Sequence, residues 1–124
     1  MTEASARSVS LAIPPKPDYI VLARLALSAI CRLTPLQPDD VADLKLAVSE
    51  VATERLAGAP EGAVRLDFEL EDDRLVVDLH AGSAPAGSED ALSRAIVEAT
   101  VDEVTYNESS VRLVKRLPDS ESEA

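Results

Sequence analysis

The sequence predicts an α+β domain, a two-layer sandwich in which three helices cover a mostly antiparallel mixed sheet. Three observations lead to this prediction: three segments with helical periodicity, two pairs of strand-like segments, and proline, glycine or acidic residues between them. The predicted order is strand, helix, helix, strand, strand, helix, strand, strand, which segregates the helices from the strands. For 124 residues we expect one domain, spanning 8–117, with flexible ends at 1–7 and 118–124.

The first half of the chain begins with a strand and a long apolar helix. Residues 8–13 alternate weakly and predict the strand, and the prolines after them exclude a helix before Asp18, the expected N-cap. The helix is predicted from about Tyr19 to Leu33. Its apolar residues cover nearly all sides, whereas a surface helix needs one apolar stripe. We therefore expect a second burial partner, which is either the sheet plus another helix or another chain.

The second helix is predicted to end at Gly58, its C-terminal cap. Pro38 suits its first turn, and Asp39 and Asp40 suit the positive end of its dipole. Apolar residues spaced by three to five positions predict one buried face: Val41, Leu44, Val48, Val51 and Leu56.

The second half of the chain predicts two hairpins with a helix between them. Residues 63–70 alternate strictly, and residues 74–81 return after a tight acidic turn. The other predicted elements are a helix from Glu89 to Thr100 with Ser88 as N-cap, and a hairpin of residues 102–107 and 110–117 that turns near Asn107 to Ser109.

Composition excludes several classes of function. Lys plus Arg number 12 against 23 Asp plus Glu, and the net charge of −11 repels phosphate backbones, so we expect no nucleic-acid partner. Cys31 and His80 are the single cysteine and histidine, which excludes an internal disulfide and a Cys/His metal site. The N-terminal residues lack the apolar core of a signal peptide. The longest apolar stretch contains Arg24 and is too short for a membrane span, so we expect a cytoplasmic protein without membrane contact.

Four stretches resemble the anti-sigma-factor serine/threonine kinases, which share the histidine-kinase/Hsp90-like ATPase fold. The stretches are "PPKPDYIVLARLALSAI", "DDVADLKLAVSEVATERLAG", "VRLDFELEDDRLVVDL" and "EATVDEVTY", and the resemblance spans about Ser8 to Leu117. It implies a bacterial homodimeric regulator that sequesters a sigma factor and phosphorylates an anti-anti-sigma protein. It also aligns Arg24 with an arginine that contacts both partners, although Arg24 could equally be a snorkelling side chain at the helix rim.

The nucleotide motifs of that family are only partly matched. The resemblance places its presumed general base on Glu50, but its magnesium-holding asparagine falls on Glu54. The adenine-binding aspartate falls near Ala81, and its loss leaves the adenine amine unpaired, at a cost of roughly 1–3 kcal/mol. Glu89 and Asp90 stand where a helix N-terminus would receive phosphates, and each would repel a phosphate charge by about 3 kcal/mol at about 5 Å and a dielectric near 20.

These departures predict an anti-sigma-like binding protein with an eroded nucleotide site, which uses neither ATP nor a metal. The alternatives are an ATP- and Mg-dependent serine/threonine protein kinase with Glu50 as its base, and a dimerisation partner for an active paralogue. Glu50 and Glu54 share a helix face at i and i+4. They could be a kinase remnant, a weak vestigial ion site, or a solvated edge beside Arg55 and Lys45.

Overall fold

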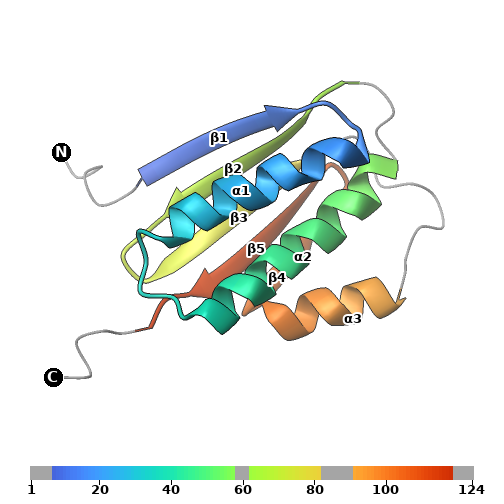
Figure 1. The fold of residues 1–124 in the computed structure, drawn as a ribbon. Helices are drawn as coiled ribbons and strands as arrows, with labels where there is room; N and C mark the ends of the chain where they lie inside the picture. Colours follow the sequence, from blue (N-terminus) through green and yellow to red (C-terminus); the bar gives the residue numbers. More distant parts are fainter. Residues whose placement is uncertain (1–6, 58–61, 82–90, 119–124) are drawn as a thin grey trace, which may run out of the picture.

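The protein folds into a five-stranded sheet with α1 and α2 across one face and α3 beside α2 (Figure 1). The computed structural model describes residues 7–57, 62–81 and 91–118. None of the described helices is both long enough and apolar enough to cross a membrane. The elements are β1 (Arg7–Ile13), a 3₁₀ helix η2 (Pro17–Tyr19), α1 (Ile20–Cys31), α2 (Pro38–Ala57), β2 (Val64–Leu70), β3 (Arg74–His80), α3 (Ala91–Thr100), β4 (Glu103–Tyr106) and β5 (Ser110–Arg116).

The described strands pair only in antiparallel fashion, in the order β1-β2-β3-β5-β4. The predicted α+β class and element order are confirmed, but the prediction of a mixed sheet is wrong. Two helices separate β1 from β2, so the chain direction reverses and the two strands pair antiparallel. A single helix separates β3 from β4, which therefore run in the same direction, but β5 lies between them and pairs antiparallel with both.

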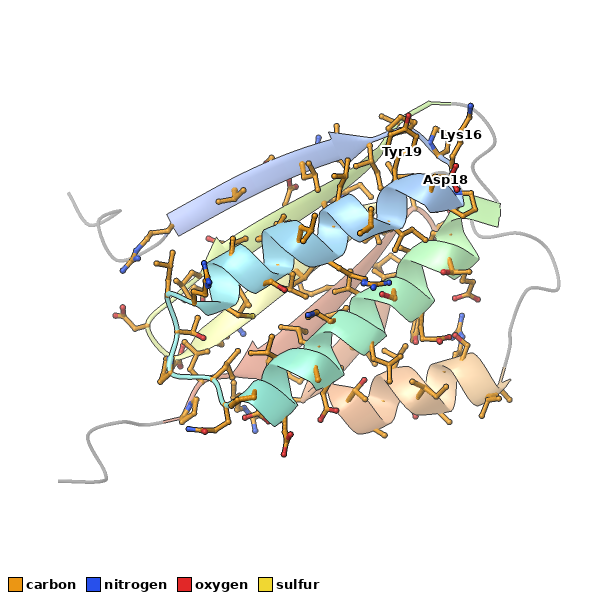
Figure 2. All side chains as sticks on the ribbon, viewed as in Figure 1. Lys16, Asp18 and Tyr19 are labelled. Atoms are coloured by element: carbon orange, nitrogen blue, oxygen red, sulfur yellow. The ribbon has the colours of Figure 1, made fainter. Side chains whose placement is uncertain are left out.

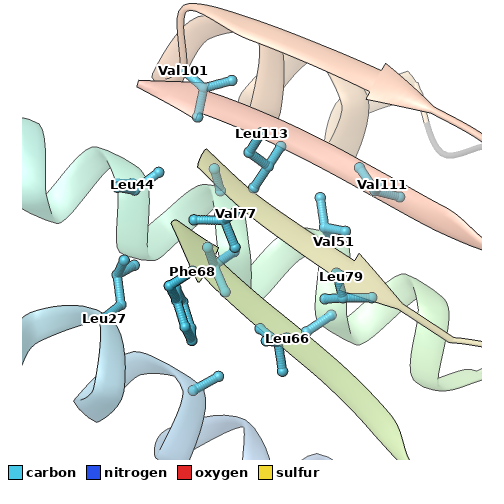
Figure 3. Packing of buried hydrophobic residues seen from close by; sticks show 14 of the residues in the cluster. Leu27, Leu44, Val51, Leu66, Phe68, Val77, Leu79, Val101, Val111 and Leu113 are labelled. Carbon is cyan, nitrogen blue, oxygen red and sulfur yellow. The ribbon is translucent and has the colours of Figure 1, made fainter. Parts of the chain in front are cut away.

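The core lies between the sheet and the two long helices, as Figure 3 shows. The strict alternation of β2 places all four of its apolar side chains on the helix-covered face, and Phe68 at their centre is 1% exposed. The predicted buried face of α2 is confirmed, with Val41 at its edge half-buried. The core side chains from these three elements are Val64, Leu66, Phe68 and Leu70 of β2, Ile20, Ala23, Leu27 and Ile30 of α1, and Leu44, Val48, Val51 and Leu56 of α2.

The first helix begins differently from the prediction. Pro17 starts a 3₁₀ turn, in which the Tyr19 N–H donates to the Lys16 carbonyl at 3.0 Å (Figure 2). Asp18 is therefore an interior residue of that turn and not the N-cap; Tyr19 takes the cap position without a side-chain cap hydrogen bond. The α-helix ends at Cys31, two residues before the predicted end. The predicted caps Gly58 and Ser88, and residues 1–6 and 119–124 of the expected flexible ends, lie outside the described residues.

The outer side of α1 is not covered by the described chain. Val21, Leu22, Leu25 and Ala29 are all exposed, and Leu25 reaches 61%. The sheet and α2 bury one face of the helix, which accounts for only part of its apolar surface. The apolar residues of α1 that stay exposed keep the other alternative open, in which a burial partner outside the described residues covers them.

Candidate functional site

Glu50 and Glu54 lie on the second half of α2, on the side that faces α3. Glu50 is half-buried, and the Ser93 hydroxyl of α3 donates to its Oε1 at 2.9 Å. Glu54, one turn later, is half-buried as well, and its Oε2 is buried without a hydrogen-bond donor among the described residues. The shared helix face is therefore as predicted, but neither carboxylate stands at a fully solvated edge.

Arg55 holds the end of α2 against the turn between β4 and β5. Its side chain is 2% exposed, and its two terminal nitrogens donate to the carbonyls of Glu108 and Asn107, each at 2.9 Å. Burial lowers the pKa of this guanidinium, and the neighbouring Glu54 carboxylate partly restores it. Arg55 therefore does not lie at the solvated edge that was predicted from the sequence; its spacing of four from Val51 and seven from Val48 places it on the buried helix face.

Arg94 of α3 stacks on Tyr106 of β4. The guanidinium carbon lies 3.9 Å from the ring centroid, within the range of a cation–π interaction. Burial raises the pKa of the Tyr106 hydroxyl, and the positive charge of Arg94 opposes that rise. Arg94 Nε and Tyr106 Oη are both buried without a hydrogen-bond partner in the described part of the chain. Neither residue was singled out from the sequence, because the contact joins two elements and leaves no local pattern.

These side chains form one polar group, which we call the α2–α3 cluster: Glu50, Glu54, Arg55, Ser93, Arg94 and Tyr106. Two carboxylates, two guanidiniums and a phenol meet at half-buried or buried positions between α2, α3 and β4. The Glu50 carboxylate accepts the hydrogen bond from Ser93 through Oε1, whereas the guanidinium of Arg55 is engaged with carbonyls and that of Arg94 with a ring. Within residues 7–57, 62–81 and 91–118, no group of three or more Asp, Glu, His or Cys side chains is arranged to hold a metal.

The adenine-reading carboxylate of the resembling family has no local substitute on β3. Ala81 occupies the expected position and is half-buried. Asp78, three residues earlier, points to the opposite face of the sheet, where Arg112 donates to both of its oxygens at 2.8 and 3.0 Å. Glu89 and Asp90 lie outside the described residues.

Arg24 lies on α1, outside the α2–α3 cluster. Its side chain is exposed and forms no ion pair with a carboxylate of the described residues. Lys45, expected beside the glutamate pair, instead lies toward α1 and lines a groove that contains Cys31. The structure therefore places the predicted partner-binding residue on a different helix from Glu50, the predicted catalytic base, and Glu54, the predicted cofactor-binding position.

Comparisons with known proteins agree with the resemblance. The chain is 29% identical to the serine-protein kinase RsbW of Staphylococcus epidermidis over 131 aligned positions, which cover 85% of this chain and 82% of that protein. It is 33% identical to RsbW of Listeria innocua over 73 residues, which cover 56% of this chain and 46% of the relative. The match thus spans about half the length of the Listeria relatives. No family model matches the chain.

The fold is also similar to a solved structure, that of the RsbU and RsbW domains of Rv1364c from Mycobacterium tuberculosis. The TM-score is 0.74 at 15% sequence identity, and the match covers 90% of this chain and 32% of that one. At this identity the structural match supports the fold alone. Together with the sequence matches, it confirms the similarity to RsbW-type proteins that the four stretches predicted.

Proposed function

We propose that this protein is an anti-sigma-type regulator that binds a sigma factor or an anti-anti-sigma protein and has an eroded nucleotide site. The observation that carries this proposal is the combination of an RsbW-like chain and fold with an α2–α3 cluster built around Glu50 and Glu54, the positions on which the resemblance places nucleotide-motif residues. A cytoplasmic location and a homodimer are part of the same proposal.

The surface of α1 supports the partner-binding half of the proposal. Arg24 is exposed and forms no ion pair with the described residues, and the exposed apolar residues Val21, Leu22 and Leu25 flank it in sequence. Apolar residues next to a free arginine suit a protein interface, because arginine and apolar side chains are enriched in interface cores. The same exposed residues offer apolar area to a second copy of the chain.

The α2–α3 cluster supports the loss of nucleotide binding. Glu54 replaces a magnesium-holding amide with a carboxylate one residue from the Arg55 guanidinium, whose charge it faces. The Arg94–Tyr106 stack fills space beside it, and a ligand entering there would have to separate the two side chains. Ala81 offers no carboxylate to an adenine.

A kinase is the second candidate, and one observation favours it. Glu50, the presumed general base, is present and is oriented by the Ser93 hydroxyl at 2.9 Å. A base that is held in place by a second residue is typical of catalytic sites. If the chain is a kinase, ATP and Mg would be its cofactors and Glu50 its catalytic residue.

A nucleotide titration separates the two candidates. A fluorescent ATP analogue with Mg is titrated into the wild type and the Glu50→Ala and Glu54→Ala variants, with Leu25→Ala as an exposed control on α1. We expect no binding in the micromolar range for any of the four proteins. Micromolar binding that Glu50→Ala or Glu54→Ala abolishes and Leu25→Ala retains would establish the kinase candidate instead.

Partner binding is tested with purified sigma factors and anti-anti-sigma proteins from the same genome. We expect at least one to be retained by the wild type and to bind Arg24→Ala about tenfold more weakly, because a charged interface contact is lost. Arg65→Ala, an exposed arginine on the opposite face of the sheet, is the matched control. If the wild type retains none of them, the anti-sigma proposal is wrong. Light scattering on the purified protein tests the homodimer.

A further inference from the structure

A groove lies where α1 ends and α2 begins, away from the α2–α3 cluster. Its volume is about 430 Å³, within the range of pockets that take a side chain or small ligand. Leu36, Val41 and Ala42 and the buried thiol of Cys31 make its walls largely apolar. Arg32 and Lys45 also line it, so the groove joins an apolar interior to two cations.

The groove continues into an exposed stripe on each helix. On α1, Val21, Leu25 and Ser28 are spaced by four and three, so they share one side of the helix with Arg32, which follows α1. On α2, Ala42, Lys45, Leu46 and Ser49 share a side in the same way. Ser28 and Arg32 meet Ala42 and Lys45 in the groove, so the two stripes border one surface, which we call the α1–α2 seam.

The seam offers apolar area along its length. Leu25 and Leu46 are exposed at 61% and 43%. From Val21 to Arg32 the first stripe is roughly 16 Å long, the rise of about three helical turns. A short helix laid along the seam could therefore contact the exposed leucines and insert one apolar side chain into the groove.

The cations at the seam are unpaired in a strongly acidic protein. Arg32 and Lys45 form no ion pair with any carboxylate among the described residues, and neither has an acidic residue three or four positions away. The segment 20–33 contains no acidic residue at all. In contrast, Arg65, Arg74, Arg112, Lys115 and Arg116 each pair with a carboxylate. With a net charge of −11, a local surface that carries only free cations has the complementary charge for an acidic partner.

We propose that the α1–α2 seam binds an acidic amphipathic helix of the regulated protein, with an apolar side chain of that helix in the groove and its carboxylates on Arg32 and Lys45. This inference rests on the proposed function and adds the site and the chemistry of recognition. The charge of the whole chain disfavours a nucleic acid at the seam. The exposed leucines beyond the groove favour a helix over a small molecule, which would leave them uncovered.

The first experimental arm uses a model helix. A fluorescent 18-residue peptide with leucine at i, i+3, i+4 and i+7 and glutamate on its other faces is titrated against the whole chain by anisotropy. The matched peptide carries lysine in place of glutamate. We expect saturable binding of the acidic peptide and at least about tenfold weaker binding of the lysine peptide, because the lysine peptide carries the same charge sign as the seam. The acidic peptide should also bind more weakly at 0.5 M salt, because salt screens the attraction between exposed charges.

Variants locate the binding. The double variant Arg32→Glu/Lys45→Glu should weaken binding of the acidic peptide by about tenfold, and Arg32→Gln/Lys45→Gln by about threefold. Each exposed charge pair contributes up to about 1 kcal/mol, and the glutamates add repulsion. Arg65→Glu/Arg116→Glu makes the same charge change away from the seam and should leave binding within twofold. The urea midpoint of each variant shows that it folds.

The second arm repeats the variants with the sigma factor or anti-anti-sigma protein that the wild type retains. If that partner binds the seam variants as tightly as the wild type, the seam proposal is overturned and the proposed function stands. If the acidic peptide binds at the seam but no regulator of this class is retained, the proposed function is overturned and the seam remains a binding site. If the peptide has a Kd weaker than about 1 mM, or if the seam variants change only the monomer–dimer ratio, the seam proposal is wrong.

Discussion

Removing the Arg55 side chain should destabilise the protein more than any other arginine substitution on α2 or the sheet. The guanidinium donates to the carbonyls of Asn107 and Glu108, and its aliphatic stem is packed among core residues at 2% exposure. Arg55→Ala removes both hydrogen bonds and the packing of the stem, and it detaches the end of α2 from the β4–β5 turn.

The magnitude follows from three contributions. Hydrogen bonds to a charged group contribute about 1.5–3 kcal/mol each when the acceptor cannot rehydrate. Here Asn107 and Glu108 belong to an exposed turn and can bind water, so we take roughly 0.5–1 kcal/mol for each bond. The stem contributes about 0.8 kcal/mol for each buried methylene. Alanine lacks two of the methylenes, so these contributions sum to roughly 2.6–3.6 kcal/mol. Relief of the desolvated charge offsets part of this sum, which leaves about 2–3 kcal/mol for Arg55→Ala.

The assay is equilibrium urea unfolding followed by circular dichroism. With a slope of about 2 kcal/mol per molar urea, the midpoint of Arg55→Ala should fall by about 1–1.5 M. Arg55→Met keeps most of the apolar stem and loses the charge, so it should cost only about 1 kcal/mol. Arg116→Ala is the exposed control and should stay within about 0.5 kcal/mol. A midpoint for Arg55→Ala within 0.3 M of the wild type, or equal losses for Ala and Met, would refute this account of a buried, packed arginine.

Three further predictions concern other parts of the molecule. The hydrogen bond from Ser10 lowers the pKa of Asp67, so the ionised carboxylate stabilises the fold at neutral pH. This contribution is lost as the pH falls from the unfolded pKa of about 4 through the lower folded pKa. Asp67→Asn should therefore flatten the loss of stability between about pH 5 and pH 3, measured as urea midpoints, and an unchanged slope would contradict this prediction. Burial raises the pKa of the Cys31 thiol, so Ellman's reagent at pH 8 should modify the native protein at least about tenfold more slowly than the protein in urea, and equal rates would show that the thiol is open. Phe68→Ala should cost about 3–5 kcal/mol of unfolding free energy because it leaves a cavity at the centre of the core, while Leu25→Ala on the exposed side of α1 should cost less than about 0.5 kcal/mol.

The faces of individual elements could be predicted from the sequence because they depend on local periodicity. Alternation over β2 predicts which side chains point to the core, and the spacing of Leu44, Val48 and Val51 predicts the buried side of α2. Charge and composition are equally local: the net charge of −11 and the single cysteine can be counted without a fold. The failure at Asp18 is also local, because Pro17 favours a 3₁₀ turn that competes with the expected cap.

The candidate site was only half predictable, since its members come from elements far apart in the chain. Helical spacing indicates that Glu50 and Glu54 share a face, but Ser93 meets Glu50 only after α3 docks beside α2. The bonds from Arg55 to the β4–β5 turn span more than fifty residues of chain. The stack of Arg94 on Tyr106 joins a helix to an edge strand.

What the sequence alone determined is the set of main elements, the buried sides of α2 and β2, and the family that the chain resembles. Only the tertiary structure decided that β5 enters between β3 and β4, that a polar cluster occupies the space between α2 and α3, and that the free cations line one apolar seam. The physical reason is that periodicity describes the contacts of one element with solvent or core. Contacts between two elements depend on how both are placed, and no single stretch of sequence carries that information.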